Sequence, residues 1–334
     1  MIDGHIHFVK AMKNQNLNQL ISEKGLSGIA LQCIPQSDGI PVEDDAFQFA
    51  RQSNVPVYIF GGINRQIYSL SEEQMENALV EEVKIRMEEG CTGIKMLEGK
   101  PQIRKAYPIP DFDKKVWDAY WTYLEKEQIP VYFHVNDPEE FWDSEKISRH
   151  ALECGWLYDE TFVNNEDQYR QLENVLISHP NLRILFPHFF FFSKQLDRLS
   201  RILNKAPQMR IDITPGIELY YNLSNQPEEA NAFFRKYQNR ILYGTDIGAR
   251  EEVREKGEPL SLKEAGSRMN LICRFLETKG TYTMYPDGLY VQDGPTQMHG
   301  LGLEENILKK IYEDNFMTFI ETSPNKIGRR KHYE

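Results

Sequence analysis

The sequence has few cysteines, and none of them lie close together. Its 334 residues include four, without any CxxC spacing, at Cys33, Cys91, Cys154 and Cys273. This scatter fits free thiols better than a disulfide framework. Free thiols are typical of a reducing compartment, so we expect a cytoplasmic protein.

Long apolar runs are also lacking. No stretch approaches the roughly 20 apolar residues that a membrane-spanning helix requires. A His-x-His pair begins four residues after Met1, which leaves no room before it for a signal peptide. We therefore expect a protein that is neither inserted into a membrane nor secreted.

Basic residues are fewer than acidic ones. The chain has 39 Lys and Arg against 50 Asp and Glu, which gives a formal net charge of -11. This balance argues against a surface for nucleic acid or for an anionic membrane. Hydrophobic residues make up 40% of the sequence, enough for a sizeable core. We expect the partner to be a small-molecule substrate.

Short runs rich in β-branched and aromatic residues alternate with longer charged stretches, a pattern that indicates successive βα units. The eight runs are Ile2–Phe8, Gly28–Ile34, Val55–Ile63, Gly93–Leu97, Val131–Asn136, Leu182–Phe189, Met209–Thr214 and Ile241–Ile247. The intervening helices are expected at 14–24, 42–53, 71–89, 111–127, 166–178, 194–205 and 227–238. Eight such units predict a (β/α)8 TIM barrel that forms a single domain over residues 1–334.

Two connections are longer than a minimal βα unit. They follow the fifth and eighth strands, at residues 137–165 and 249–300. Extended loops at the C-terminal face of a barrel usually shape its active site, so both are candidate lids. A last helix, about Glu304–Glu321, is expected to close the barrel.

The first strand carries the clearest chemical signal. His5 and His7 are two residues apart, so in a regular strand they point to the same side, together with Asp3. Ile2, Ile6 and Phe8 suit the side that faces the helices. Both imidazoles are then expected in the barrel lumen, where two convergent nitrogens can chelate a metal ion.

Ionisable residues are also expected at the ends of four later strands. They are Lys95, His134, His188 and Asp246 on the fourth, fifth, sixth and eighth strands. Such groups are costly to bury unless they are paired or bind a metal. A single strand-end histidine is more often structural, and Asp246 alone fits a helix N-cap. The residues taken together, in this order along the strands, therefore favour a metal site more strongly than any one of them does alone.

With these motifs the sequence resembles the amidohydrolase superfamily, and within it the amidohydrolase-2 type proteins. The resemblance rests on IDGHIHF at 2–8, GIKML at 93–97, YFHVND at 132–137, FPHF at 186–189 and YGTD at 243–246. The family includes hydrolases, lactonases and decarboxylases of small carboxylated substrates. Its members are often dimers or larger, and the sequence leaves a homo-oligomer open.

The resemblance implies a ligand set. His5, His7 and Asp246 would hold a first metal, and His134 would bind that metal or a second one. His188 would bind a second metal or act as a catalytic hydrogen-bond donor, and Lys95 would be carbamylated and bridging, or free. We expect one tightly held Zn²⁺ with a second metal weaker or absent; Mn²⁺ and Fe²⁺ remain alternatives.

This ligand set suits hydrolysis of an amide, ester or lactone bond. A divalent ion acidifies water, and Asp246 would take the proton and pass it to the leaving group, while the metal or His188 would polarise the carbonyl. Four residues are expected to contact the substrate: Arg65, Asn136, Tyr220 and Arg250. The two arginines would favour a carboxylated substrate, because guanidinium groups bind carboxylates bidentately.

Other functions fit parts of the same pattern. The ligand set also supports a metal-dependent decarboxylase or hydratase, in which the metal stabilises a substrate anion. A non-catalytic metal-binding barrel is a remote alternative. A phosphoesterase with an HxH first strand would need further histidine motifs, which the sequence does not show.

Overall fold

A computed structural model describes residues 1–8, 14–35, 42–216, 218–248, 262–284 and 296–321. Its centre is one sheet of eight parallel strands, joined in the order of the sequence from first to last. The strands are β1 Ile2–Phe8, β2 Gly28–Cys33, β3 Val57–Gly62, β4 Gly93–Gly99, β5 Val131–Val135, β6 Ile184–Phe186, β7 Arg210–Asp212 and β8 Ile241–Leu242. Every residue of these strands is buried.

The segment that follows β8 closes the sheet against β1. Ile6 and Ile247 form a parallel bridge, and the main-chain amide of His7 donates to the carbonyl of Ile247 at 2.9 Å. Gly4 lets β1 and the segment after β8 approach each other, because a Cβ there would lie 2.9 Å from the carbonyl oxygen of Tyr243. The fold is therefore the (β/α)8 TIM barrel that the sequence predicts.

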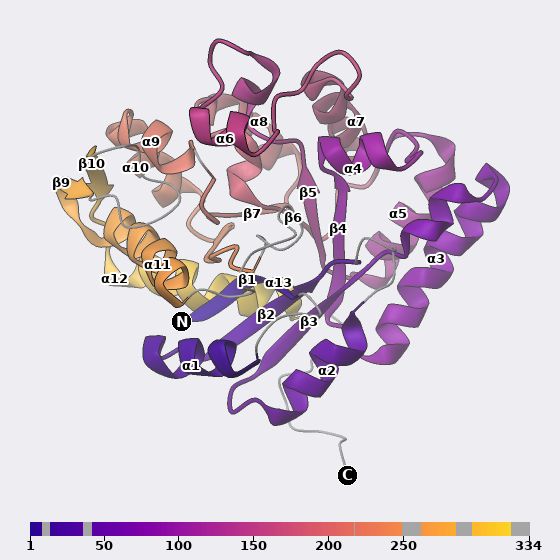
Figure 1. Ribbon diagram of the computed structural model, residues 1–334, viewed down its shortest axis with the longest axis horizontal. Helices are drawn as coiled ribbons and strands as arrows, with labels where there is room; N and C mark the ends of the chain where they lie inside the picture. Colours follow the sequence, from indigo (N-terminus) through magenta and orange to yellow (C-terminus); the bar gives the residue numbers. More distant parts are fainter. Residues whose placement is uncertain (9–13, 36–41, 217, 249–261, 285–295, 322–334) are drawn as a thin grey trace.

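Helices surround the strands, with α2, α3 and α5 on one flank and α9 to α12 on the other (Figure 1). Their bounds are α1 Asn14–Lys24, α2 Glu43–Gln52, α3 Glu72–Glu89, α4 Pro101–Ala106, α5 Asp118–Glu127, α6 Arg149–Glu153, α7 Asn165–Ser178, α8 Leu196–Lys205, α9 Leu219–Ser224, α10 Pro227–Lys236, α11 Leu262–Glu277, α12 Glu305–Lys309 and α13 Asn315–Ile320. The longest, α3, begins with a Ser71–Gln74 capping box and ends at the left-handed Gly90. In the described parts of the chain, no helix combines the length and apolar character needed to cross a membrane.

The N-terminal end of the barrel is filled by an apolar plug. Residues from the strands meet aromatic residues of α13 in one buried cluster: Ile2, Ala30, Tyr58, Phe60, Tyr132, Leu185, Leu242, Phe316, Phe319 and Ile320. This bears out the expected closing helix, although a π-helical turn at Lys310–Asp314 divides it from α12. The opposite, C-terminal end of the barrel is the end at which TIM-barrel active sites lie.

Strand β1 departs from regular alternation. Its pairing with β2 shifts register between Asp3 and Ile6. Ile2 consequently joins the plug inside the barrel, whereas Ile6 and Phe8 pack toward the helices. The expectation that all three apolar residues face the helices is wrong for Ile2, because the irregularity exchanges the two faces of the strand.

The two long connections differ from simple loops. Residues 137–165 form an insertion with a 3-10 helix at Glu139–Trp142, helix α6 and an apolar cluster of their own. The second connection, 249–300, contains α11 and a hairpin of β9 Lys279–Met284 with β10 Thr296–Leu301. Its residues 249–261 and 285–295 lie outside the described residues.

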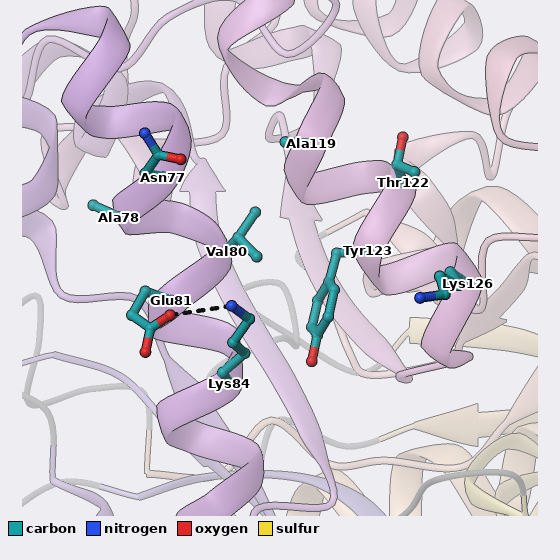
Figure 2. A pocket seen from close by; sticks show the side chains of 9 residues that line it. All are labelled: Asn77, Ala78, Val80, Glu81, Lys84, Ala119, Thr122, Tyr123 and Lys126. Carbon is teal, nitrogen blue, oxygen red and sulfur yellow. Dashed lines mark hydrogen bonds and ion pairs between the residues drawn. The ribbon is translucent and has the colours of Figure 1, made fainter.

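An open surface groove of about 650 Å³ lies between α3 and α5 (Figure 2). Its walls carry short apolar side chains and an exposed ion pair between Lys84 and Glu81 at 3.2 Å. No histidine or cysteine lines this groove. It belongs to the outer helix layer, so the chemistry of the chain has to be sought in the barrel.

Candidate metal centre

Three predicted ligands converge at the C-terminal end of β1. One donor atom each from His5, His7 and Asp246 lies within 4.8 Å of the others, and within the described residues these three form the single such group. The Nε2 atoms of His5 and His7 are 3.1 Å apart. Asp246 Oδ1 lies 2.8 Å from His7 Nε2 and 3.6 Å from His5 Nε2. Two imidazoles and a carboxylate are a donor set that suits a divalent ion.

Asp212, on β7, orients His5 from behind. Its Oδ2 lies 2.8 Å from His5 Nδ1, which places the proton of a neutral imidazole on Nδ1 and leaves a lone pair on Nε2. Its Oδ1 accepts hydrogen bonds from the main-chain amide of His188 and the hydroxyl of Thr214 at 2.9 and 2.6 Å. One carboxylate thus fixes two site histidines.

The ionisation of the three donors also suits a cation. Burial lowers the pKa of both His5 and His7, so both are neutral near pH 7. Burial alone would raise the pKa of Asp246, but its hydrogen-bonded contact with His7 holds that pKa well below its ordinary value. Neutral imidazoles and an ionised carboxylate are the forms that bind metal, and the residues therefore fit a divalent ion.

Asp246 reaches the site through an unusual backbone conformation. Its φ is +56°, in the left-handed region, rather than that of a strand end. Arg268 of α11 supports this turn by donating to the carbonyl oxygen of Asp246 at 2.6 Å, and it lies 3.5 Å from Oδ2. The arginine thereby holds the carboxylate while leaving Oδ1 toward the histidines.

Lys95 lies beside the group. It is buried on β4, and its Nζ is 3.1 Å from His5 Nε2. Desolvation and the lysine charge both contribute to lowering the pKa of His5. The predicted lumen position of Lys95 is confirmed, whereas its carbamylation stays a prediction.

His188 lies just beyond β6, not within a strand as expected. Four consecutive residues, His188 to Phe191, have φ between +53° and +59°. Left-handed conformations cost non-glycine residues roughly 1–2 kcal/mol each, and strain of this kind is commonly kept at functional sites. His188 Nδ1 is 3.1 Å from Thr214 Oγ1, and its ring centroid is 6.0 Å from that of His5. Its Nε2 is therefore the nitrogen suited to act in the site.

His134 stands further from the group. On β5, its Nε2 lies 2.9 Å from the carbonyl oxygen of Asn136 and 3.5 Å from Asp137 Oδ1. Its ring meets that of His188 edge to face at 5.2 Å. Nε2 is therefore the protonated nitrogen, and any ligand role would fall to Nδ1. The part expected of His134 in metal binding stays a prediction.

Two of the four expected substrate contacts, Asn136 and Tyr220, make hydrogen bonds within the protein. Asn136 is fully buried; its side chain binds Gln168 at 2.6 Å and the carbonyl of Asn165 at 3.1 Å. The hydroxyl of Tyr220 donates to the carbonyl of Ile213 at 2.5 Å, inside the core. The polar groups of both side chains already have partners within the protein, and their roles in binding substrate stay predictions.

The arginines remain predictions. Arg65 is buried, with its guanidinium carbon 5.4 Å from the centre of the Tyr107 ring. Its Nε and Nη2 have no hydrogen-bond partner among the described residues. Its charge partly offsets the effect of burial, which raises the pKa of Glu98. Arg250 lies outside the described residues.

Sequence reasoning missed several residues that organise the site. Asp212 and Arg268 act through the ligands, and Asp137 acts beside His134. Asp212 had a readable signal: it is a carboxylate in the seventh apolar run, where burial requires a partner. Arg268 had none, because α11 approaches β8 only in the folded chain.

The orienting role of Asp212 leads to a prediction. Replacing Asp212 with Asn leaves one acceptor oxygen but removes the charge opposite His5 Nδ1. We expect zinc affinity to fall about 10- to 100-fold, the usual cost of losing such a partner. Competition with a chromophoric chelator measures this, with circular dichroism as a check on folding. Unchanged affinity in the folded variant would show that His5 is held by other contacts.

Comparison with known proteins adds the family. A model of the amidohydrolase family, of the amidohydrolase-2 type, matches residues 69–315, which is most of the chain. The chain belongs to the amidohydrolase family. The match begins after β3, so the assignment of His5 and His7 as candidate ligands rests on the geometry above. A comparison with curated proteins gave no match.

Solved structures share the amidohydrolase fold at low sequence identity. A 2,6-dihydroxybenzoate decarboxylase from Rhizobium is 14% identical, with a TM-score of 0.54 over 96% of this chain and 98% of its own. A dihydroxybenzoic acid decarboxylase from Polaromonas sp. JS666, with bound manganese and 2-nitroresorcinol, is 12% identical (TM-score 0.53; 96% and 96%). A probable 2-pyrone-4,6-dicarboxylic acid hydrolase from Acinetobacter baumannii, with citric acid bound, is 11% identical (TM-score 0.50; 96% and 98%). These likenesses establish the fold alone, and the reactions named differ.

Proposed function

We propose that this protein is a metal-dependent hydrolase of a small, carboxylated molecule, with His5, His7 and Asp246 holding a divalent ion. The observation that carries the proposal is the convergence of these three donors within 4.8 Å at the open end of the barrel. Zinc is the first candidate because it favours imidazole and carboxylate ligands. Manganese and iron are the alternatives. The ion would supply a Lewis acid and an acidified water.

The chain's own residues divide the remaining work. Asp246 is ionised and carries an oxygen beside His7, so it accepts a proton from the attacking water and returns it to the leaving group. His188 is held by Thr214 at Nδ1 and presents Nε2 to the substrate carbonyl. Asp212 holds the His5 ring and the main chain of His188 in place.

A decarboxylase is the second candidate, and one observation favours it. The ring of Phe191 stacks on His188 at 5.2 Å and meets His134 edge-on at 5.6 Å, next to the metal group. Such a wall suits a planar aromatic acid. Two of the structures compared are named as decarboxylases of dihydroxybenzoates.

A substrate screen in ¹⁸O-labelled water separates the two reactions. Zinc-loaded and manganese-loaded protein would be incubated with lactones, esters, amides and aromatic acids. We expect a carboxylic acid product that carries one ¹⁸O atom from the solvent. Release of carbon dioxide with no ¹⁸O in the organic product would overturn the hydrolase proposal in favour of the decarboxylase.

A further inference from the structure

The insertion at 137–165 has a hydrophobic core separate from that of the barrel. Phe141, Ala151 and Tyr158 are buried together, and further aromatic and aliphatic side chains pack on them: Trp142, Ile147, Trp156 and Phe162. The amide of Tyr158 also donates to the carbonyl of Phe141 at 2.7 Å, which joins the two ends of the insertion. The segment is thus a small packed unit that has to be seated on the barrel.

One carboxylate forms the buried part of that seat. Asp137, immediately after β5, accepts a hydrogen bond from the hydroxyl of Tyr158 at 2.6 Å. Lys100, after β4, donates to both oxygens of the same carboxylate, at 2.8 and 3.0 Å. Asp137 and Tyr158 are each only 3% exposed, so water screens these contacts little.

Three further polar contacts between the insertion and the barrel lie at the surface. Lys194 pairs with Glu140, Gln195 bonds Glu139 at 3.1 Å, and Lys105 bonds Thr161 at 2.6 Å. All three contacts are exposed. Exposed pairs contribute little to stability, so the buried Asp137 contacts hold the insertion more firmly than these three do.

The same carboxylate reaches a residue of the site. Asp137 Oδ1 lies 3.5 Å from His134 Nε2, the nitrogen that also contacts the carbonyl of Asn136. His134 in turn packs edge-on against His188. A shift of Asp137 therefore changes what holds the His134 ring.

We propose that Asp137 is a positioning residue that couples the seating of the insertion to the orientation of His134. Tyr158 and Lys100 hold the carboxylate, and the carboxylate with the Asn136 carbonyl holds the imidazole. This inference rests on the proposed function in one respect, namely that His134 lies beside the reacting groups. A looser insertion would then move the His134 ring without removing any metal ligand.

Tyr158→Phe tests the coupling, because it removes only the hydroxyl that reaches Asp137. Tyr312→Phe is the matched control: Tyr312 also donates to a carboxylate, Glu277 at 2.7 Å, but far from the insertion in the sequence and in a different helical segment. Both variants and the wild type would be studied as the full chain loaded with zinc. The readouts are hydrogen exchange of residues 138–162 and the ¹⁵N resonances of His134, assigned with His134→Gln.

Tyr158→Phe is expected to speed exchange in the insertion about tenfold, as loss of a hydrogen bond to a charged group allows, and to shift the His134 resonances. Tyr312→Phe is expected to change neither. A looser insertion with unchanged His134 resonances would overturn the coupling, and unchanged exchange would overturn the seat. Neither readout requires turnover, so failure to find a hydrolase activity is a separate result.

If the proposed activity is found, a third readout distinguishes positioning from simple stability. Tyr158→Phe is expected to lower kcat, with the melting temperature close to that of the wild type. Asp137→Asn keeps an acceptor oxygen for Tyr158 but loses the charge that holds Lys100, and the same fall in kcat is expected. Wild-type kcat in both variants would remove Asp137 from the catalytic arrangement.

Discussion

Replacing Asp246 with Asn is expected to reduce turnover by about a thousandfold or more while the barrel stays folded. General acid–base groups contribute roughly 10²- to 10⁴-fold, and the proposed function gives Asp246 both the acid and the base step. The side chain is ionised beside His7, with Oδ1 2.8 Å from Nε2. Asn has a side chain of the same size and keeps one oxygen that can bind a metal ion, but it cannot accept the proton. Steady-state kinetics of zinc-loaded protein measure the effect.

The control for this variant is Asp143→Asn, in the insertion. Asp143 pairs with Lys146 and accepts a hydrogen bond from the main-chain amide of Glu145 at 3.0 Å, both at the surface, and its replacement should leave kcat unchanged. Metal content has to be measured for Asp246→Asn in parallel, because loss of the ion would itself abolish turnover. Activity within tenfold of the wild type, with metal bound, would remove Asp246 as the proton-transfer group.

Replacing Glu218 with Gln is expected to stabilise the protein at alkaline pH. The carboxyl oxygens of Glu218 are buried without a hydrogen-bond partner among the described residues. Burial, with smaller contributions from the charges of Glu140 and Asp137, raises its pKa to about 8. The ordinary value is 4.5. The folded chain therefore keeps a proton that the unfolded chain has lost between these two values.

The sign of the pH dependence follows from this difference. As pH rises from 4.5 toward 8, unfolding releases the proton of Glu218, so the free energy of unfolding falls. Gln cannot ionise and does not carry this cost. At pH 8 we expect Glu218→Gln to be more stable by the order of a few kcal/mol, with the difference shrinking toward pH 5.

Thermal unfolding at several pH values tests this prediction. The melting temperature of Glu218→Gln should exceed that of the wild type by a few degrees at pH 8. Glu73→Gln, at an exposed position of α3, is the control and should change little. A difference that is absent at pH 8, or that grows toward acid, would show that Glu218 has a partner that stabilises its charge.

The order of the strands could be predicted from the sequence, but their local irregularities could not. Eight apolar runs separated by helices were enough for the barrel, and the HxH pair for its first strand. The register shift within β1 places Ile2 in the lumen, against the alternation expected. The apolar pattern does not reveal such a shift. Every residue of β1 is buried, whichever face of the strand it lies on.

His188 and Asp246 show a related limit. Both were expected at strand ends pointing inward, and both belong to the site, but by another route. Each has a positive φ and lies after its strand, where alternation no longer applies. Residues other than glycine rarely adopt this conformation, so the sequence does not predict it at His188 or Asp246. Tertiary contacts such as Thr214 to His188 and Arg268 to Asp246 select it.

The hydrogen-bond partners of the expected substrate residues were the least predictable. Asn136 and Tyr220 follow strand ends, as substrate contacts often do, yet their polar atoms bond within the protein. Position in the sequence says which end of the barrel a residue occupies. It does not say whether neighbouring loops already supply its hydrogen bonds, since those loops are distant in sequence, as Gln168 is from Asn136.

The metal content of the purified protein shows whether His5 and His7 hold a divalent ion. Wild-type protein purified from metal-replete cells, and the variant with both His5 and His7 changed to Ala, would be compared by elemental analysis, with circular dichroism to verify folding. We expect about one to two divalent ions per chain in the wild type and none in the folded variant. A wild-type barrel that folds without metal and takes up none when zinc, manganese or iron is supplied would contradict it.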